Sequence, residues 1–69
     1  MNDHVYRVIE LVGSSTETVE DAIDNAVERA SKTVRHLDWF EVVETRGQIV
    51  NNEVAYYQVR LKIGFRVED

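Results

Sequence analysis

Four side chains in the second half of the chain belong to the types that hold planar or anionic small molecules. Trp39, the single tryptophan, offers a flat surface on which a ring system can stack. Gln58 carries both a donor and an acceptor, the pattern that complements the edge of a cyclic imide. Arg46 and Arg66 are each able to bind a phosphate group through two nitrogen atoms. These residue types favour ligand binding if the fold places them on one surface.

Each of the four residues also has an ordinary structural interpretation, which the sequence leaves open. Large aromatic residues are mostly buried, so Trp39 can belong to the core, although Phe40 faces the other side of the strand and can fill that place instead. A glutamine on the polar face of a strand is usually solvated. Surface ion pairing is the default for the charged residues of the last two strands: Arg46, Arg66, Arg60, Lys62, Glu41 and Glu44.

The residues that carry out covalent or acid–base chemistry are missing or isolated in this sequence. The chain has no cysteine, and its serines at positions 14, 15 and 31 are not part of a nucleophile motif. His4 and His36 lie far apart, and neither has an orienting carboxylate at a matching spacing. The sequence contains neither a glycine-rich phosphate loop nor a metal motif. We therefore predict a protein that is not an enzyme and holds no metal.

Composition limits the partners of the protein. The 69 residues include 13 acidic and 8 basic ones, which gives a formal net charge of −5. This balance argues against a nucleic-acid partner, because phosphate neutralisation needs a basic face. No stretch approaches the roughly 20 apolar residues of a membrane span, and the first residues do not have the pattern of a signal peptide. We expect a cytoplasmic protein without a membrane partner.

Hydrophobic periodicity predicts one strand followed by one helix in the first half of the chain. Residues 5–12 are rich in β-branched and aromatic types and lead into a turn at residues 13–15. Thr18, with a carboxylate three residues later, is typical of a helix start. From there apolar residues recur every three or four positions, so we expect the helix to continue to about Leu37.

The second half of the chain predicts a β-hairpin. Residues 39–50 and 54–67 are typical of long strands, and Asn51-Asn52 between them tolerates the positive φ of a tight turn. The second of these strands alternates apolar and polar residues, so one of its faces can pack on the helix. The expected fold class is α+β with the order β-α-β-β. We expect a three-stranded antiparallel sheet with one helix packed across it, in a single domain over residues 1–69.

The lengths of these elements predict self-association. A helix of the expected length spans about 28 Å, whereas the strands reach about 40 Å or more, so the sheet extends beyond its cover. A domain this small buries only about 60% of the surface of its unfolded chain. Without cysteine, homo-oligomerisation is the remaining source of stability. The uncovered face, with Tyr56, Gln58 and Arg60 near Trp39, is the expected interface or ligand surface.

Five segments resemble the dodecin family: VIELVGSS at 8–15, LDWFEV at 37–42, RG at 46–47, YQV at 57–59 and KIGFR at 62–66. The resemblance runs nearly end to end, and DWFE and GFR are its most specific parts. It implies a β-α-β-β subunit that assembles into a hollow homododecamer with twofold and threefold axes and binds flavins in pairs. The expected ligand is flavin mononucleotide (FMN) or riboflavin.

The resemblance also implies a role for each candidate residue. Trp39 matches the stacking residue of the family, so two Trp39 side chains from twofold-related subunits would sandwich a pair of isoalloxazine rings. Gln58 matches the residue that pairs with the pyrimidine edge. Arg46 and Arg66 match basic positions near the side chain or phosphate of the flavin. Two stacked faces and one paired edge are sufficient for micromolar or tighter binding.

The sequence departs from the family pattern at three places. Tyr56 and Gln48 stand where relatives often have histidine, and these changes can alter the rim of the pocket and the choice of flavin. Asn51-Asn52 replaces a more usual Asp-Gly turn, which affects only the hairpin. None of these changes involves Trp39 or Gln58.

Two functions follow from these observations. The first is a non-catalytic flavin reservoir, in which stacking on Trp39 quenches the excited flavin and suppresses its photochemistry. The second is an oligomeric scaffold or storage module that binds coenzyme A or a protein partner. The observation that suggests the second function is a basic cluster of Arg7, Arg60 and Lys62 on an acidic chain. A small enzyme would need catalysis by one of the two histidines, which we do not expect.

Overall fold

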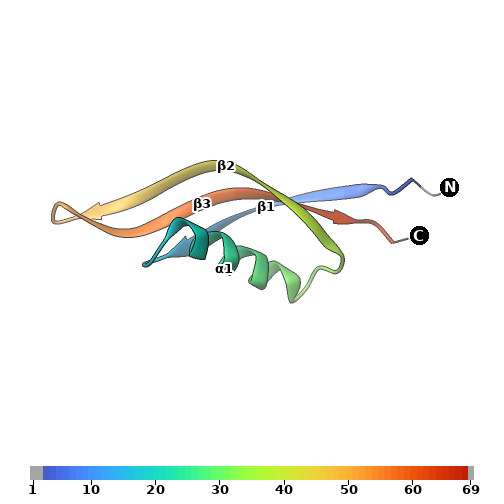
Figure 1. Ribbon diagram of the computed structural model, residues 1–69, viewed down its shortest axis with the longest axis horizontal. Helices are drawn as coiled ribbons and strands as arrows, with labels where there is room; N and C mark the ends of the chain where they lie inside the picture. Colours follow the sequence, from blue (N-terminus) through green and yellow to red (C-terminus); the bar gives the residue numbers. More distant parts are fainter. Residues whose placement is uncertain (1–2, 69) are drawn as a thin grey trace.

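The computed structural model describes residues 3–68 and contains one helix and three strands. The elements are β1 (Tyr6–Ser15), α1 (Val19–Ser31), β2 (Leu37–Val50) and β3 (Glu53–Arg66). The strands form one antiparallel sheet in the order β1-β3-β2, so the last strand of the chain is the central one. α1 lies along one face of this sheet (Figure 1). The α+β fold class and the β-α-β-β order are confirmed.

The hairpin between β2 and β3 turns at the two asparagines, as predicted. Asn51 and Asn52 have φ angles of 52° and 65°, in the left-handed region that asparagine tolerates better than most residues. The pairing that follows is interrupted by three register shifts, between Leu37 and Trp39, between Val42 and Glu44, and between Gln48 and Ile49. Shifts of this kind are β-bulges, which twist an edge strand and hinder its pairing with other chains.

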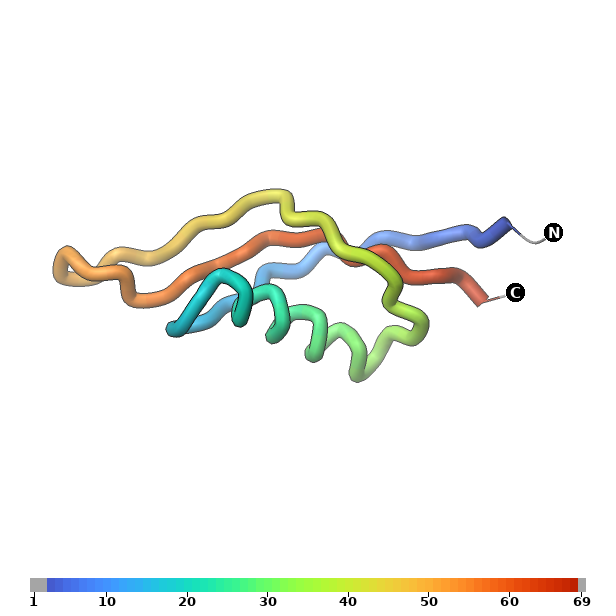
Figure 2. The backbone as a smooth tube through the Cα atoms, in the orientation of Figure 1, coloured from blue at the N-terminus to red at the C-terminus, as the bar shows by residue number. Residues whose placement is uncertain are grey.

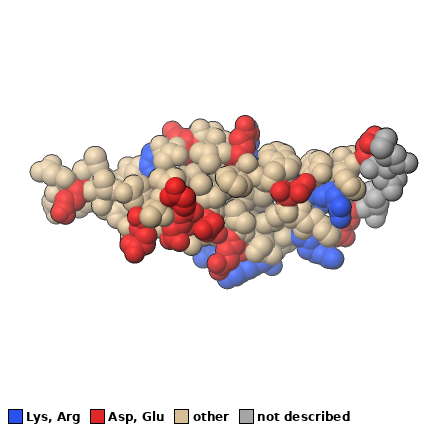
Figure 3. All heavy atoms as spheres, viewed as in Figure 1, with Lys and Arg blue, Asp and Glu red and all other residues tan. Residues whose placement is uncertain are grey.

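α1 begins at the predicted cap. The backbone N–H of Asp21 donates to Thr18 Oγ1 at 2.9 Å, and the Ser15 hydroxyl donates to the Asp21 carboxylate at 2.8 Å. Acidic side chains gather over the first turns of α1, where the helix dipole is positive, and basic ones lie towards its other end (Figure 3). These contacts fix the junction between β1 and α1.

The first strand is longer than expected. β1 continues to Ser15, through the turn predicted at residues 13–15, because it pairs with β3 as far as Tyr57. Gly13 lies within this pairing and not in a turn. A Cβ built on Gly13 would overlap the carbonyl group of Ala22, so its small size allows α1 to contact the strand backbone.

The helix is shorter than expected. α1 ends at Ser31 instead of near Leu37, and the N–H groups of Thr33 and Val34 make the last bonds to the carbonyl of Ala30. The backbone after α1 pairs with the sheet instead of continuing the helix, because the His36 carbonyl accepts a hydrogen bond from the N–H of Arg66 at 3.0 Å. His36 takes a φ of 66°, which turns the chain into β2. Leu37 therefore packs against the core from the start of a strand.

The core lies between α1 and the middle of the sheet. Its buried members are small residues of α1 and branched residues of β3: Ala22, Ala26, Ala30, Val59, Leu61 and Ile63. The apolar helix stripe thus packs on the apolar face of β3, as the alternation predicted. This core is small for a domain that has no disulfide.

The sheet extends well beyond the helix. α1 has 13 residues, about 20 Å, whereas β2 and β3 have 14 residues each, about 46 Å. The molecule measures 56 × 20 × 14 Å, and the β2–β3 hairpin passes beyond both β1 and α1 (Figure 2). The overhang predicted from the element lengths is confirmed. Within residues 3–68, no helix has the length and apolar character needed to cross a membrane.

Candidate functional site

The side chains of the sheet that point away from α1 form a second surface, which we call the open face. Val59, Leu61 and Ile63 of β3 pack towards α1, so the residues between and beside them point to the open face. Residues paired across strands project to the same side. By this register all four predicted site residues belong to the open face: Trp39, Arg46, Gln58 and Arg66.

Trp39 lies on the open face at the end of the sheet where β2 begins. It pairs with Gly64 of β3, and its indole lies directly above that residue. A Cβ built on Gly64 would overlap the ring atoms Cε2, Cζ2 and Nε1. Trp39 is 42% exposed, so it is not part of the buried core and its outer surface is free in the isolated chain. The core interpretation of Trp39 is therefore wrong.

Phe40 faces the opposite side of β2 and does not seal the core in its place. It pairs with Ile63 and so points towards α1, as expected, but it is 51% exposed. Phe40, Val27 and Leu37 line a hollow of about 130 Å³ at this end of the helix. The Trp39-Phe40 pair thus presents apolar area on both faces of the sheet, which a single chain leaves uncovered.

Gln58 lies near the middle of β3, where the pairing with β1 approaches its end. It occupies the central strand, between Ser14 of β1 and Arg46 of β2. Gln58 and Ser14 line a hollow of about 530 Å³, together with Tyr56 and Asn25. The Asn25 side chain donates to the Ser14 carbonyl at 2.9 Å, which holds α1 to this edge of the sheet. The amide of Gln58 is therefore half-buried in polar surroundings.

Within one subunit the predicted site residues form two groups. Trp39 and Arg66 lie at the end of the sheet near Gly64, whereas Arg46 lies beside Gln58. Gln58 lies six positions before Gly64 along β3, which corresponds to about 20 Å. The fold thus brings all four residues to one face, but it does not bring Trp39 and Gln58 together in one chain.

A row of charges crosses the open face between the two groups. Arg60 Nε lies 3.4 Å from Glu10 Oε2, and Arg60 Nη2 lies 3.7 Å from Glu44 Oε1. Lys62 lies opposite Glu10 and Glu41 in the register. The predicted pairing of Arg60 with an acid of the hairpin is confirmed, and its second partner comes from β1.

The basic cluster suggested by the sequence is not formed. Arg7 pairs with Phe65, so it projects to the side of the sheet that carries α1. Arg60 and Lys62 belong to the open face, and Arg60 is held between two acids. The expectation that these three cations gather on one surface is wrong. Successive residues of a strand point to opposite faces, and Arg7 pairs with a residue whose side chain points to the face opposite to Arg60 and Lys62.

Polar residues surround the Trp39 end of the open face. Tyr6 of β1 pairs with Arg66, and Asp38 lies in the β-bulge directly before Trp39. A hydrogen bond between the Tyr6 hydroxyl and Asp38 raises the pKa of Tyr6 above its usual value. Desolvation and the negative charge of Asp38 act in the same direction, while Arg66 acts to lower this pKa. Tyr6 of β1 and Asp38 therefore lie close together at this end of the sheet.

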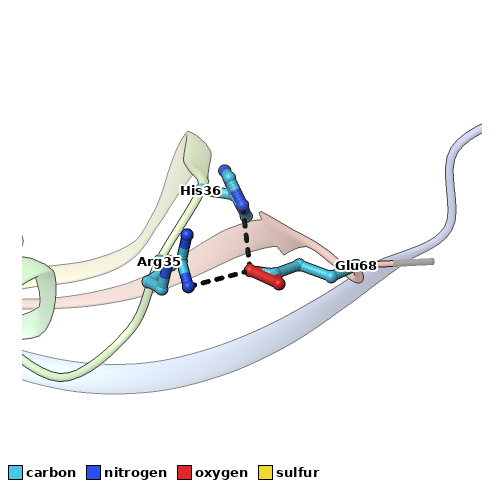
Figure 4. Close-up of polar contacts among 3 residues, drawn as sticks. All are labelled: Arg35, His36 and Glu68. Atoms are coloured by element: carbon cyan, nitrogen blue, oxygen red, sulfur yellow. Dashed lines mark hydrogen bonds and ion pairs between the residues drawn. The ribbon is translucent and has the colours of Figure 1, made fainter.

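The two histidines approach the same end of the sheet. His4 and His36 both line a hollow of about 300 Å³ beside Tyr6 and Asp38. His36 Nε2 lies 3.0 Å from Glu68 Oε1, and Arg35 Nη1 lies 3.6 Å from the same oxygen (Figure 4). These contacts tie the start of β2 to the residues after β3. Among residues 3–68, no group of three or more His, Asp or Glu side chains is arranged to hold a metal.

Three residues of this surface lie outside the set proposed from the sequence: Gly64, Tyr6 and Asp38. Two bulges lie between the asparagine turn and the Trp39–Gly64 pair, and they shift the register in opposite directions. The pair is therefore the one expected from a hairpin of regular register that starts at this turn. The contact of Tyr6 with Asp38 depends on a third bulge and on a strand distant in the sequence. No local pattern indicates that contact.

Comparisons with known proteins give one consistent result. The dodecin family model matches residues 5–68. The dodecin of Thermus thermophilus is 57% identical over 65 residues, which are 94% of each chain. The structure of dodecin from Streptomyces coelicolor superposes with a TM-score of 0.94 at 56% identity, covering 100% of this chain and 99% of that one. Dodecin from Streptomyces davaonensis gives a TM-score of 0.94 at 50% identity, covering 99% and 100%. This chain therefore belongs to the dodecin family.

Proposed function

We propose that this protein is a non-catalytic flavin-binding protein that stores FMN or riboflavin and suppresses its photochemistry. The observation that carries the proposal is the position of Trp39, a partly exposed indole on the face of the sheet that α1 leaves uncovered. Stacking of a nucleobase on an aromatic side chain contributes roughly 1–3 kcal/mol, and the isoalloxazine ring offers a larger planar surface. Close stacking also quenches the excited flavin. Membership of the dodecin family supports the same function.

Each flavin site in this proposal is built from more than one subunit. The distance of about 20 Å along β3 between Gly64, under Trp39, and Gln58 exceeds the length of an isoalloxazine ring system. A flavin that stacks on Trp39 therefore meets Gln58 only from another chain. In the proposed site, two Trp39 side chains enclose a pair of flavins at a twofold axis, and Gln58 pairs with the pyrimidine edge.

Assembly into a hollow homododecamer accounts for the apolar surface that the single chain leaves exposed. Val8, Val12 and Ile49 are large hydrophobic side chains that are at least half exposed, in addition to Trp39 and Phe40. Exposed apolar area on this scale is typical of interfaces. The small core between α1 and β3 also favours association as a source of stability.

The two arginines are proposed to bind the flavin side chain or its phosphate. Arg46 projects beside Gln58, and Arg66 lies at the Trp39 end of the open face. A site assembled from both ends of two chains would therefore have a guanidinium at each side. A guanidinium binds phosphate through two parallel hydrogen bonds, which favours FMN over riboflavin.

The departures from the family pattern lie at the rim of this surface. Gln48 and Tyr56 pair with each other across the hairpin, two residues along β3 from Gln58. Tyr56 also lines the hollow beside Gln58. We propose that this pair affects which flavin is preferred and leaves stacking on Trp39 unchanged.

We propose flavin binding in preference to the coenzyme A or scaffold function. Its motive was the basic cluster of Arg7, Arg60 and Lys62, and these residues lie on two different faces of the sheet. Arg60 is in addition neutralised by Glu10 and Glu44. No other feature of the described residues favours that function over flavin binding.

Titration of FMN with the purified protein tests the proposal. We expect flavin emission to fall as protein is added, with saturation near one flavin per chain, and the particle mass from light scattering to be twelve times that of the chain. Trp39→Ala should abolish the quenching. Phe40→Leu is the matched control, because Phe40 is the adjacent exposed aromatic residue on the opposite face. Unchanged emission with wild-type protein, or full quenching by Trp39→Ala, would contradict the proposal.

A further inference from the structure

Gly64 is the residue on which the Trp39 indole rests. A Cβ built on Gly64 would fall among three bonded ring atoms of the indole, Nε1, Cε2 and Cζ2. Gly64 is buried beneath that ring, although the open face around it is largely exposed. The ring therefore lies directly against the backbone of the central strand. Any side chain at position 64 would keep the ring from approaching the backbone this closely.

The backbone of Gly64 does not itself require glycine. Its φ is not positive, so an alanine can adopt the same backbone conformation. Glycine within a strand weakens the strand and often marks a close approach of another group. The three atoms nearest to a methyl group at this position all belong to Trp39. The reason for glycine is thus the space above the strand and not the chain conformation.

We propose that Gly64 is a positioning residue for flavin binding: its missing side chain seats the Trp39 indole against β3, so that the outer surface of the ring is presented to the ligand. This inference rests on the flavin-binding function proposed above and adds a residue that does not contact the ligand. A methyl group at position 64 would lift or rotate the indole and misalign the two rings that enclose a flavin pair.

Gly64→Ala provides the direct test. Trp39 is the single tryptophan, so intrinsic fluorescence reports on this indole alone. In ligand-free Gly64→Ala we expect the tryptophan emission maximum to shift. We also expect iodide to quench the tryptophan emission more strongly than in wild type, because the indole no longer packs against the strand backbone. The concentration of FMN at half-saturation should rise about tenfold or more, the order of magnitude of one lost stacking contact.

Gly47→Ala is the matched control. Gly47 lies in the same hairpin, also without a positive φ, and a Cβ there would meet the Tyr56 carbonyl oxygen at 3.0 Å but no aromatic ring. We expect Gly47→Ala to keep the tryptophan emission and FMN titration of wild type. If Gly64→Ala does the same while assembling normally, the positioning role is overturned.

A double variant covers the case in which Gly64→Ala fails to assemble. If the fault is a collision with the indole, Trp39→Ala removes it, so Trp39→Ala/Gly64→Ala should assemble and melt like Trp39→Ala alone. A double variant that also fails to assemble would overturn the inference. The fluorescence measurements use protein without flavin, so they test Gly64 separately. Absence of FMN binding by wild type would contradict the proposed function but not the packing of the Trp39 indole on Gly64.

Discussion

Trp39 and Gln58 project from the same face of one sheet but lie about 20 Å apart along β3. Arg60 stands between them and bridges Glu10 and Glu44. A ligand that contacts both Trp39 and Gln58 must therefore contact two chains. If flavin binds as proposed, its binding and subunit assembly are thermodynamically linked, because a complete site then exists only in the assembled protein.

This linkage predicts that flavin stabilises the assembly. At a free FMN concentration 100 times the dissociation constant, one saturated site adds about 2.7 kcal/mol to the free energy of unfolding. We expect the thermal midpoint of the particle to rise with FMN concentration, measured by circular dichroism. Trp39→Ala should keep its midpoint when FMN is added. A wild-type midpoint that does not depend on FMN would contradict the linkage.

Substitution of Gln58 separates edge recognition from stacking. Gln58→Ala removes one donor and one acceptor, so the dissociation constant for FMN should rise about tenfold, since a net hydrogen bond contributes about 0.5–1.5 kcal/mol. Emission should still be quenched at saturation, because Trp39 is unchanged. Gln58→Glu, which only accepts when ionised, should bind as weakly as the alanine variant. Affinity equal to wild type in both variants would remove Gln58 from the site.

The two arginines are tested by comparing ligands that differ only in the phosphate. If Arg46 or Arg66 binds the phosphate, its alanine variant should lose affinity for FMN and keep its affinity for riboflavin. Higher salt should weaken FMN binding to wild type more than to the variant, because a charge pair near the surface is screened. Equal losses for both flavins would assign the arginine to the ring or to the structure instead.

The contact between Tyr6 and Asp38 predicts an alkaline dependence of stability. The pKa of Tyr6 is raised in the folded protein by its hydrogen bond to Asp38, so the folded state binds the phenolic proton more tightly than the unfolded state. The contribution is therefore complete below pH 10.0, the ordinary pKa of tyrosine, and is lost as the pH rises through the pKa of Tyr6 in the folded protein. Urea unfolding at increasing pH should show this loss in wild type.

Variants at this contact supply the control. Tyr6→Phe removes the titrating group, and its stability should fall less steeply above pH 10.0 than that of wild type. Absorbance titration of the tyrosines should lose its component of raised pKa in the same variant. Asp38→Asn should move that component to lower pH. Identical alkaline profiles in all three proteins would contradict the contact.

Gly13→Ala probes the close packing of α1 on β1. A methyl group there would overlap the backbone carbonyl of Ala22, and backbone cannot move aside as a flexible side chain can. Overpacking of this kind costs about 1–3 kcal/mol. We expect a lower midpoint in urea for Gly13→Ala than for wild type, with no change in the emission of Trp39. A midpoint equal to wild type would show that α1 shifts freely on the sheet.

The elements that depend on neighbouring residues follow from the sequence alone. The asparagine turn, the cap at Thr18 and the apolar alternation along β3 are all present where predicted. The order of elements and the overhang of the strands follow from the same patterns.

The boundaries and groupings that depend on contacts between distant segments do not follow from the sequence. The helical periodicity continues past Ser31, but pairing of His36 with Arg66 takes the chain into the sheet. The exposure of Trp39 depends on the tertiary structure, because α1 covers only part of the sheet.

The amino-acid sequence by itself indicated which side chains are of types suited to a planar ligand and which strands carry them, since local spacing sets the face of a strand. Only the tertiary structure showed that Trp39 lies over Gly64 and that Gln58 is far from it in the same chain. Those relationships depend on register and bulges, which are set by the summed pairing of whole strands and not by any one residue.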